Sequence, residues 1–191
     1  MTARLLTVIC LLPIISPARA QELQVHTFNR QQLSDVYYSE GIAAGDLNGD
    51  QSMDIVYGPH WYAGPEFTAK QEIYPAVPQN RDGYADNFFN WVYDFDKDGW
   101  NDVLVVGFPG TPAFVYRNPG KDGLTGLWEK LQVADSVSNE APQFADITGD
   151  GVPELVCTRN GNYGFYVPQK TEPLGAWTFV SVSEPTAPTP C

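Results

Sequence analysis

The apolar residues of this chain fall into short runs with the spacing of β-strands. Runs at 55–57, 103–106 and 155–157 are rich in Val, Ile and Leu, and each follows a polar loop that contains glycine. A strand-like segment, such as 88–93, precedes the loop. Short β-branched and aromatic runs between Gly, Pro, Asn and Asp are typical of strands. Because no segment has a useful amphipathic helical period, the sequence predicts an all-β fold.

Two more strand-like segments follow each run, and the whole pattern then repeats. The third segments are rich in aromatic residues and lie at 61–65, 115–120 and 165–168. The fourth segments alternate apolar and polar residues and lie at 67–73, 128–133 and 177–182. Four short strands in about 50 residues, separated by turns, are typical of one blade of a β-propeller. The sequence therefore predicts about three blades, each of four antiparallel strands, over residues 40–183.

The loops between the first two predicted strands carry oxygen-bearing side chains at alternate positions. They read D-L-N-G-D-Q-S-M-D at 46–54, D-F-D-K-D-G-W-N-D at 94–102 and D-I-T-G-D-G-V-P-E at 146–154. A tight loop of this kind can gather its oxygens around one point, and Ca²⁺ prefers about six to eight such ligands. The twelfth positions, which are Tyr57, Val105 and Cys157, cannot supply the bidentate Glu of an EF-hand.

The three loops resemble those of FG-GAP/VCBS repeats, the calcium-loop blades of integrin-α-type propellers and of many exported bacterial proteins. The resemblance covers about residues 40–182. In that family, the side chains at loop positions one, three, five and nine bind Ca²⁺ together with the carbonyl of position seven. The resemblance therefore implies three calcium sites with these residues: Asp46, Asn48, Asp50, Ser52 and Asp54; Asp94, Asp96, Asp98, Trp100 and Asp102; and Asp146, Thr148, Asp150, Val152 and Glu154.

Departures from the loop pattern give an expected order of affinity. The third loop departs most, because Thr148 is neutral and Glu154 is longer than Asp by one methylene. The first loop has Gln51 where the others have glycine after position five. We therefore expect the second loop to bind Ca²⁺ most tightly, the first loop next and the third loop least.

The number of blades departs from the family as well. Its propellers typically have about seven blades, and closure removes exposed strand edges. Three blades cannot close, so we expect an open, incomplete propeller. Its further blades would come from additional sequence or from another chain.

The two ends of the chain differ in composition from the predicted blades. Residues 1–20 have the features of a secretory signal peptide: Arg4 at the start, an apolar run that is too short to span a membrane, and A-R-A at 18–20. We therefore expect secretion to the periplasm or cell surface, without membrane insertion. Residues 21–39 would lead into the blades as a strand or loop, and 184–191 would form a Pro/Thr-rich tail.

The charge of the chain fits metal-loaded loops. The formal net charge is −12, and many of the 23 acidic residues lie in the three loops, where bound Ca²⁺ would compensate them. There is no basic patch for phosphate groups, so we expect no nucleic-acid partner. Beyond the signal peptide the sequence has two cysteines, Cys157 and Cys191. The sequence does not decide whether they form a disulfide.

No sequence motif of a known catalytic site is present. The chain has no P-loop, dinucleotide fingerprint or G-x-S-x-G motif, and its histidines are His26 and His60. The main hypothesis is therefore an exported, calcium-binding β-propeller repeat module that binds protein or carbohydrate and is not catalytic. The alternative is the N-terminal propeller part of a carbohydrate-acting lyase or dehydratase-like enzyme, in which His60 would be the catalytic candidate.

Overall fold

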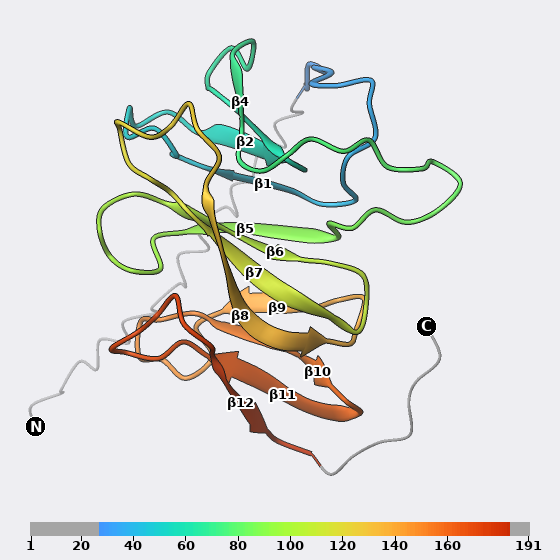
Figure 1. The fold of residues 1–191 in the computed structure, drawn as a ribbon, viewed down its shortest axis with the longest axis vertical. Coiled ribbons are helices and arrows are strands. Elements are labelled where there is room, and N and C mark those ends of the chain that lie inside the picture. Colours follow the sequence, from blue (N-terminus) through green and yellow to red (C-terminus); the bar gives the residue numbers. More distant parts are fainter. Residues whose placement is uncertain (1–26, 184–191) are drawn as a thin grey trace, which may run out of the picture. The chain divides into compact units, whose positions relative to one another are not determined.

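A computed structural model describes residues 27–183, and the regular structure in this range consists of β-strands. The chain divides into two compact units, 1–31 and 32–191, and all the strands belong to the second unit. They form three separate four-stranded sheets, none of which closes on itself (Figure 1). The described residues contain no helix that is long and apolar enough to cross a membrane. The predicted all-β fold with open, propeller-type blades is confirmed.

Each sheet is an antiparallel meander of four consecutive strands, as predicted, and we call the sheets blades 1 to 3. Blade 1 consists of β1 (Ile42–Gly45), β2 (Asp54–Tyr57), β3 (His60–Tyr62) and β4 (Lys70–Glu72). Blade 2 consists of β5 (Phe89–Tyr93), β6 (Asp102–Val106), β7 (Thr111–Arg117) and β8 (Glu129–Val137). Blade 3 consists of β9 (Gln143–Ala145), β10 (Glu154–Arg159), β11 (Asn162–Val167) and β12 (Thr178–Ser181).

The second and third strands pair in the same register in every blade. The residue after the ninth loop position faces a tyrosine on the third strand in all three cases. These pairs are Ile55 with Tyr62, Val103 with Tyr116, and Leu155 with Tyr166. Residues at the same offset from these pairs are therefore structurally equivalent, and we compare the blades on this basis below.

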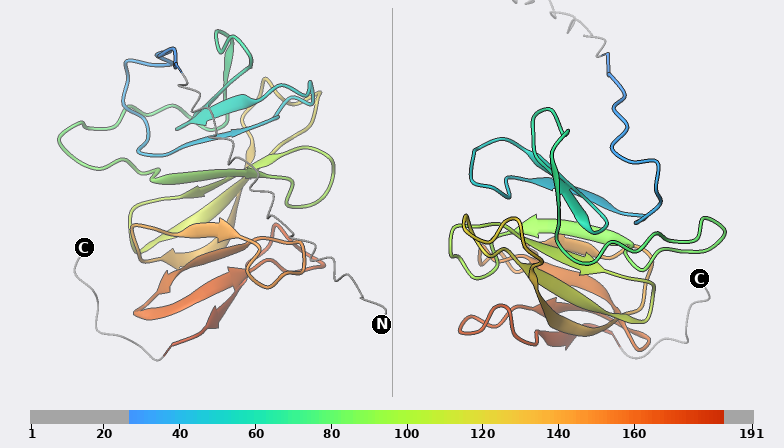
Figure 2. Two further views of the ribbon diagram at one scale, coloured as in Figure 1. Left: turned by 180° about the vertical axis from the view of Figure 1, so that it is seen from behind. Right: turned by 45° about the horizontal axis from the view of Figure 1, so that its top comes forward.

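Blade 2 packs against both of its neighbours through alternate residues of β6. Val103 and Val105 belong to the core between blades 1 and 2, whereas Leu104 and Val106 belong to the core between blades 2 and 3. Successive side chains of a strand point to opposite faces of the sheet, and every residue of β6 is buried. Both faces of β6 therefore contact an apolar core, and Figure 2 shows blade 2 between the other two blades.

A tryptophan just before the outer strand ties each of the later blades to the blade before it. The backbone N–H of Trp128 donates to the carbonyl of Ile73 in blade 1 at 2.8 Å, and that of Trp177 donates to Val133 in blade 2 at 2.7 Å. Both indoles are buried in the cores between blades. On the inner side, β1 approaches β5 so closely that a Cβ on Gly45 would lie 2.3 Å from the Val92 side chain.

Some strand boundaries differ from those expected. The fourth strand of blade 1 spans only Lys70–Glu72, because Phe67 has a φ of 55° and lies in a turn, with its N–H bonded to the Ala63 carbonyl. A left-handed backbone cannot continue a strand. The fourth strand of blade 2 runs past Val133 to Val137. Residues 27–39 contain no strand, and the expected signal peptide and the tail at 184–191 lie outside the described residues.

We predict that Leu104→Ala destabilises the protein by about 2–5 kcal/mol, because it leaves a cavity in the fully buried core between blades 2 and 3. Urea unfolding measures the loss. The matched control is Leu127→Ala, because Leu127 is exposed and the same substitution there should cost within about 0.5 kcal/mol. Equal losses for the two variants would contradict the packing described for β6.

Candidate metal sites

The three acidic loops join the first and second strands of their blades and fold around their own carboxylates. The Asp at position one accepts backbone N–H groups from later in the loop, and the Asp at position five accepts the N–H of position seven. The bonds to position one come from Gly49 and Gln51 to Asp46, from Asp98 and Gly99 to Asp94, and from Gly149 and Gly151 to Asp146. The bonds to position five come from Ser52, Trp100 and Val152, whose carbonyls are expected metal ligands.

Position six has a left-handed backbone in all three loops, which explains the preference for glycine there. The φ angles are 69° at Gln51, 93° at Gly99 and 87° at Gly151. A residue with a Cβ is disfavoured in this conformation by roughly 1–2 kcal/mol, whereas glycine is not. The first loop therefore carries strain at position six, whereas the second loop carries it at position four, where Lys97 has a φ of 60° and the other two loops have glycine.

The acid at position nine is almost completely buried in each blade and accepts backbone hydrogen bonds. Asp54 accepts the N–H groups of Leu47 at 2.8 Å and Gly64 at 2.9 Å. Asp102 likewise accepts those of Phe95 at 3.2 Å and Asn118 at 2.7 Å. One carboxylate thus fixes both the start of the loop and the end of the third strand.

Glu154 makes a different set of bonds because a proline follows the third strand of blade 3. The residue equivalent to Gly64 and Asn118 is Pro168, which has no N–H to donate. Glu154 accepts the N–H of Ile147 at 2.9 Å, and its other oxygen accepts the hydroxyl of Thr148 at 2.8 Å. Thr148, expected as a weak metal ligand, therefore already has a partner within the loop.

The loops differ in how closely they gather their acids. Ligand oxygens of Asp94, Asp96 and Asp102 lie within 4.8 Å of one another, and so do those of Asp146, Asp150 and Glu154. Among the described residues the first loop has no such group of three acids. There the Asn48 amide and Asp50 bond to each other instead, at 3.1 Å between Nδ2 and Oδ2. The third loop thus gathers its acids more closely than the first, while the expected order of calcium affinity stays a prediction.

Burial and neighbouring charge disfavour the ionised form of the position-nine aspartates in the first and second loops. Burial raises the pKa of Asp102 to about 7, with a further rise from Asp96 and Asp98, although the two backbone N–H bonds lower it. Burial also raises the pKa of Asp54. A cation close to these carboxylates would favour their charged form.

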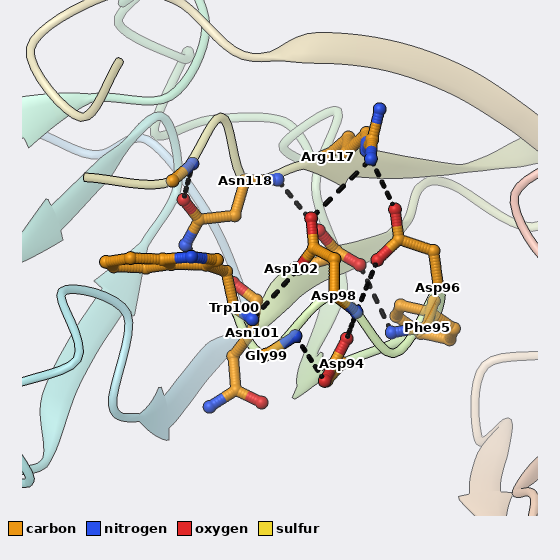
Figure 3. Close-up of polar contacts among 11 residues, drawn as sticks. Asp94, Phe95, Asp96, Asp98, Gly99, Trp100, Asn101, Asp102, Arg117 and Asn118 are labelled. Carbon is orange, nitrogen blue, oxygen red and sulfur yellow. Dashed lines mark hydrogen bonds and ion pairs between the residues drawn. The ribbon is translucent and has the colours of Figure 1, made fainter. Parts of the chain in front are cut away.

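Arg117 is a basic residue at the second loop that the sequence analysis did not single out. It ends β7, and Nη2 lies 2.8 Å from Asp96 and 3.5 Å from Asp98 (Figure 3). The equivalent residues, Ala63 and Val167, carry no charge. This difference could have been found in the sequence only by aligning the third strands on their repeated tyrosine, which places Arg117 opposite two uncharged residues. At the third loop, Lys170 lies 3.6 Å from Asp150.

Two asparagines join the first and second loops across the boundary between blades 1 and 2. The Asn101 amide donates to the Asp46 carbonyl at 2.7 Å, and the Asn118 amide donates to the Leu47 carbonyl at 2.8 Å. Both lie beside Trp100 in Figure 3. Their equivalents in blade 3 are Pro153 and Pro168, so the second and third loops cannot be joined in this way.

The candidate catalytic histidine, His60, lies within β3 of blade 1. It is buried, its ring packs edge-on against Tyr38 at 5.1 Å, and burial lowers its pKa. Trp61, Tyr116 and Trp128 are buried in the core between blades 1 and 2. His26 lies outside the described residues, as does Cys191, whereas Cys157 is buried and free.

The repeated meander and its acidic loop define the class of the protein. Three four-stranded blades, each with an acidic loop between its first two strands, make a β-propeller-like repeat module. Residues 94–157, from the start of the second loop into β10, match the family model of the FG-GAP-like repeat. This match agrees with the resemblance seen in the sequence and covers the second acidic loop and most of blade 2. No solved structure matches the chain.

We predict that Asp102→Asn destabilises the protein by about 1–3 kcal/mol in EGTA, because the new amide group would face a buried N–H donor that loses its acceptor. Urea unfolding at pH 8 measures the change. Asp98→Asn is the matched control: its Oδ1 still accepts the N–H of Trp100, and it loses only the partly exposed ion pair with Arg117 at 3.5 Å, so its loss in EGTA should be within about 0.5 kcal/mol. Similar losses for both variants would show that the position-nine bonds have no special role.

Proposed function

We propose that this chain is an exported, calcium-stabilised repeat module that binds a protein or carbohydrate partner and does not catalyse a reaction. The observation that carries the calcium proposal is the repeated gathering of carboxylates, within 4.8 Å of one another in two of the loops. Like charges at such distances repel unless a cation compensates them. All the expected ligands are oxygens, which Ca²⁺ prefers.

The residues that would hold Ca²⁺ are those at loop positions one, three, five, seven and nine. Bound Ca²⁺ would supply the positive charge that the buried Asp102 and Glu154 lack and would stabilise the folded loops. The second and third loops fit best, since each brings three acids together. In the second loop the Arg117 guanidinium already supplies part of this charge.

Binding of a partner is supported by a cavity of about 380 Å³ lined by residues of blades 1 and 2 and of the segment between them. Its volume falls in the usual range of ligand sites, about 300–1,000 Å³. Tyr74, Phe114 and Lys130 line it together with Asn87, a buried residue whose carboxamide oxygen has no hydrogen-bond partner. Aromatic rings beside amide and ammonium groups suit a sugar ring or a peptide.

Export to the periplasm or cell surface is supported by the sequence of residues 1–20. A basic start, a short apolar run and an A-R-A site are typical of a cleaved signal peptide. Millimolar Ca²⁺ outside the cytoplasm would suit sites of low affinity, such as those of extracellular modules with Kd values of about 10⁻⁴–10⁻³ M.

We expect Ca²⁺ to raise the midpoint of thermal unfolding. A ligand that binds only the folded state stabilises it by RT ln(1 + L/Kd), where L is the free ligand concentration, which is about 1.4 kcal/mol per site at a concentration about ten times Kd. The measurement compares thermal unfolding in millimolar Ca²⁺, in Mg²⁺ of equal ionic strength, and in EGTA. The Asp98→Asn variant, which keeps the bond from the Trp100 N–H, should lose part of the calcium effect while melting close to the wild type in EGTA. A cooperative melt that is the same in Ca²⁺ and EGTA would overturn the calcium proposal.

Removal of the Arg117 charge should have opposite effects on the stability of the metal-free protein and on the calcium affinity of the second loop. We expect Arg117→Gln to lower stability in EGTA by up to about 1 kcal/mol, as for a partly exposed ion pair. It should also increase the calcium affinity of the second loop, because no competing cation remains. Calorimetric titration with Ca²⁺ measures the affinity, and Arg159→Gln, whose partner Asp135 lies outside the loops, is the control. Unchanged affinity in Arg117→Gln would contradict competition.

A further inference from the structure

The face that each blade turns toward the next blade carries apolar residues at equivalent positions. In blade 2 the residues buried against blade 3 include Phe95, Leu104, Val106, Ala113, Val115 and Val133. The shared register assigns the corresponding face of blade 3, which we call the open face, to Ile147, Val156, Thr158, Tyr163, Phe165 and Val182. All but Thr158 are apolar or aromatic.

The open face is less covered than the equivalent residues of blade 2: Ile147, Tyr163 and Val182 are exposed, and Val156 and Phe165 are half-buried. Phe95 is 4% exposed and Ile147 is 51% exposed, although both follow the first aspartate of their loops. Val133 is 1% exposed, whereas Val182 is 67% exposed. Single exposed apolar residues are ordinary, but a contiguous apolar face indicates an interaction site.

The position of Val182 is also the acceptor position of the tryptophan link. Val182 donates its N–H to Tyr163, as the equivalent Ile73 does to Pro59, so the two residues have the same place in their blades. The carbonyls of Ile73 and Val133 each accept the N–H of a tryptophan from the next blade. Within residues 27–183 no blade follows β12 to supply such a tryptophan.

The opposite end of the stack is closed by the segment before β1. The Tyr38 ring packs against His60, and the Tyr57 hydroxyl bonds to the Tyr38 N–H and the Val36 carbonyl, both at 3.2 Å. Blade 1 also has Thr68 at the position of the linking tryptophan. A second copy therefore cannot place its blade 1 on the open face in the way that blades 2 and 3 pack.

We propose that the open face docks a further four-stranded blade that carries a tryptophan directly before its outer strand. The N–H of this tryptophan would bond to the Val182 carbonyl, and its indole would pack beside Val182 in the open face. This inference rests on the proposed repeat-module function and adds the chemistry of the partner and the direction of assembly. Blade 1 is the closed end, and blade 3 is the end that accepts the next blade.

The test extends the full chain after Cys191 with a second copy of residues 138–183, which supplies a blade with the required tryptophan. We expect the extended protein to unfold in one transition with a higher urea midpoint and a larger dependence on urea than the parent chain. Limited proteolysis should leave the added blade intact. Two variants block docking: Val182→Lys in the original blade, and Trp177→Thr in the added copy, which imitates Thr68. Each should release the added blade for digestion.

Controls make a negative result informative. Val182→Lys in the unextended chain should change stability by no more than about 0.5 kcal/mol, because the residue is exposed. An added blade that is digested equally with and without Val182→Lys would overturn the proposal. So would a dimer of the unextended chain that Val182→Lys dissociates, because a second copy would then cover the face. Thermal unfolding of the parent chain in Ca²⁺ and EGTA tests the proposed function separately.

Discussion

Each blade depends on a buried carboxylate that accepts hydrogen bonds inside the turn between its first two strands. In blades 1 and 2 this acid bonds to the N–H groups of two segments that are distant in sequence, the start of the acidic loop and the first or second residue after the third strand. A buried carboxylate without such donors would be costly. The same bonds therefore order the loop and hold the hairpins of the blade together, so that a candidate metal site and a structural joint share one side chain.

Charge in the loops is compensated unequally, and this gives the three similar sequences different properties. The second loop has Arg117 within 2.8 Å of Asp96, and the third has an exposed lysine at 3.6 Å. In the first loop the position-three residue is an amide that bonds to Asp50. The repeats are thus alike in backbone and different in electrostatics, which is expected when side chains outside a loop contribute to its charge.

The sequence predicted the parts of the fold that depend on local pattern. Strand-like runs, turn residues and the spacing of the loops were enough to predict three four-stranded blades, because these features recur at a fixed offset from each acidic loop. It could not predict that β4 would begin only at Lys70, since this depends on the left-handed turn at Phe67. Nor could it predict the role of Arg117, or that Pro168 would leave Glu154 to bond to Thr148. These depend on which residues meet once strands have paired.

The length of the acidic loop also determines which residues of β6 face each neighbouring blade. Val103 and Val105 belong to one interface and Leu104 and Val106 to the other, so a shift of one residue would exchange the two sets. The nine residues from Asp94 to Asp102 end where β6 begins, and the first and third loops have the same length. The fixed loop length therefore determines which side chains of the following strand point to which face of the sheet. A one-residue insertion would disturb both neighbouring interfaces at once, whatever it did to a bound ion.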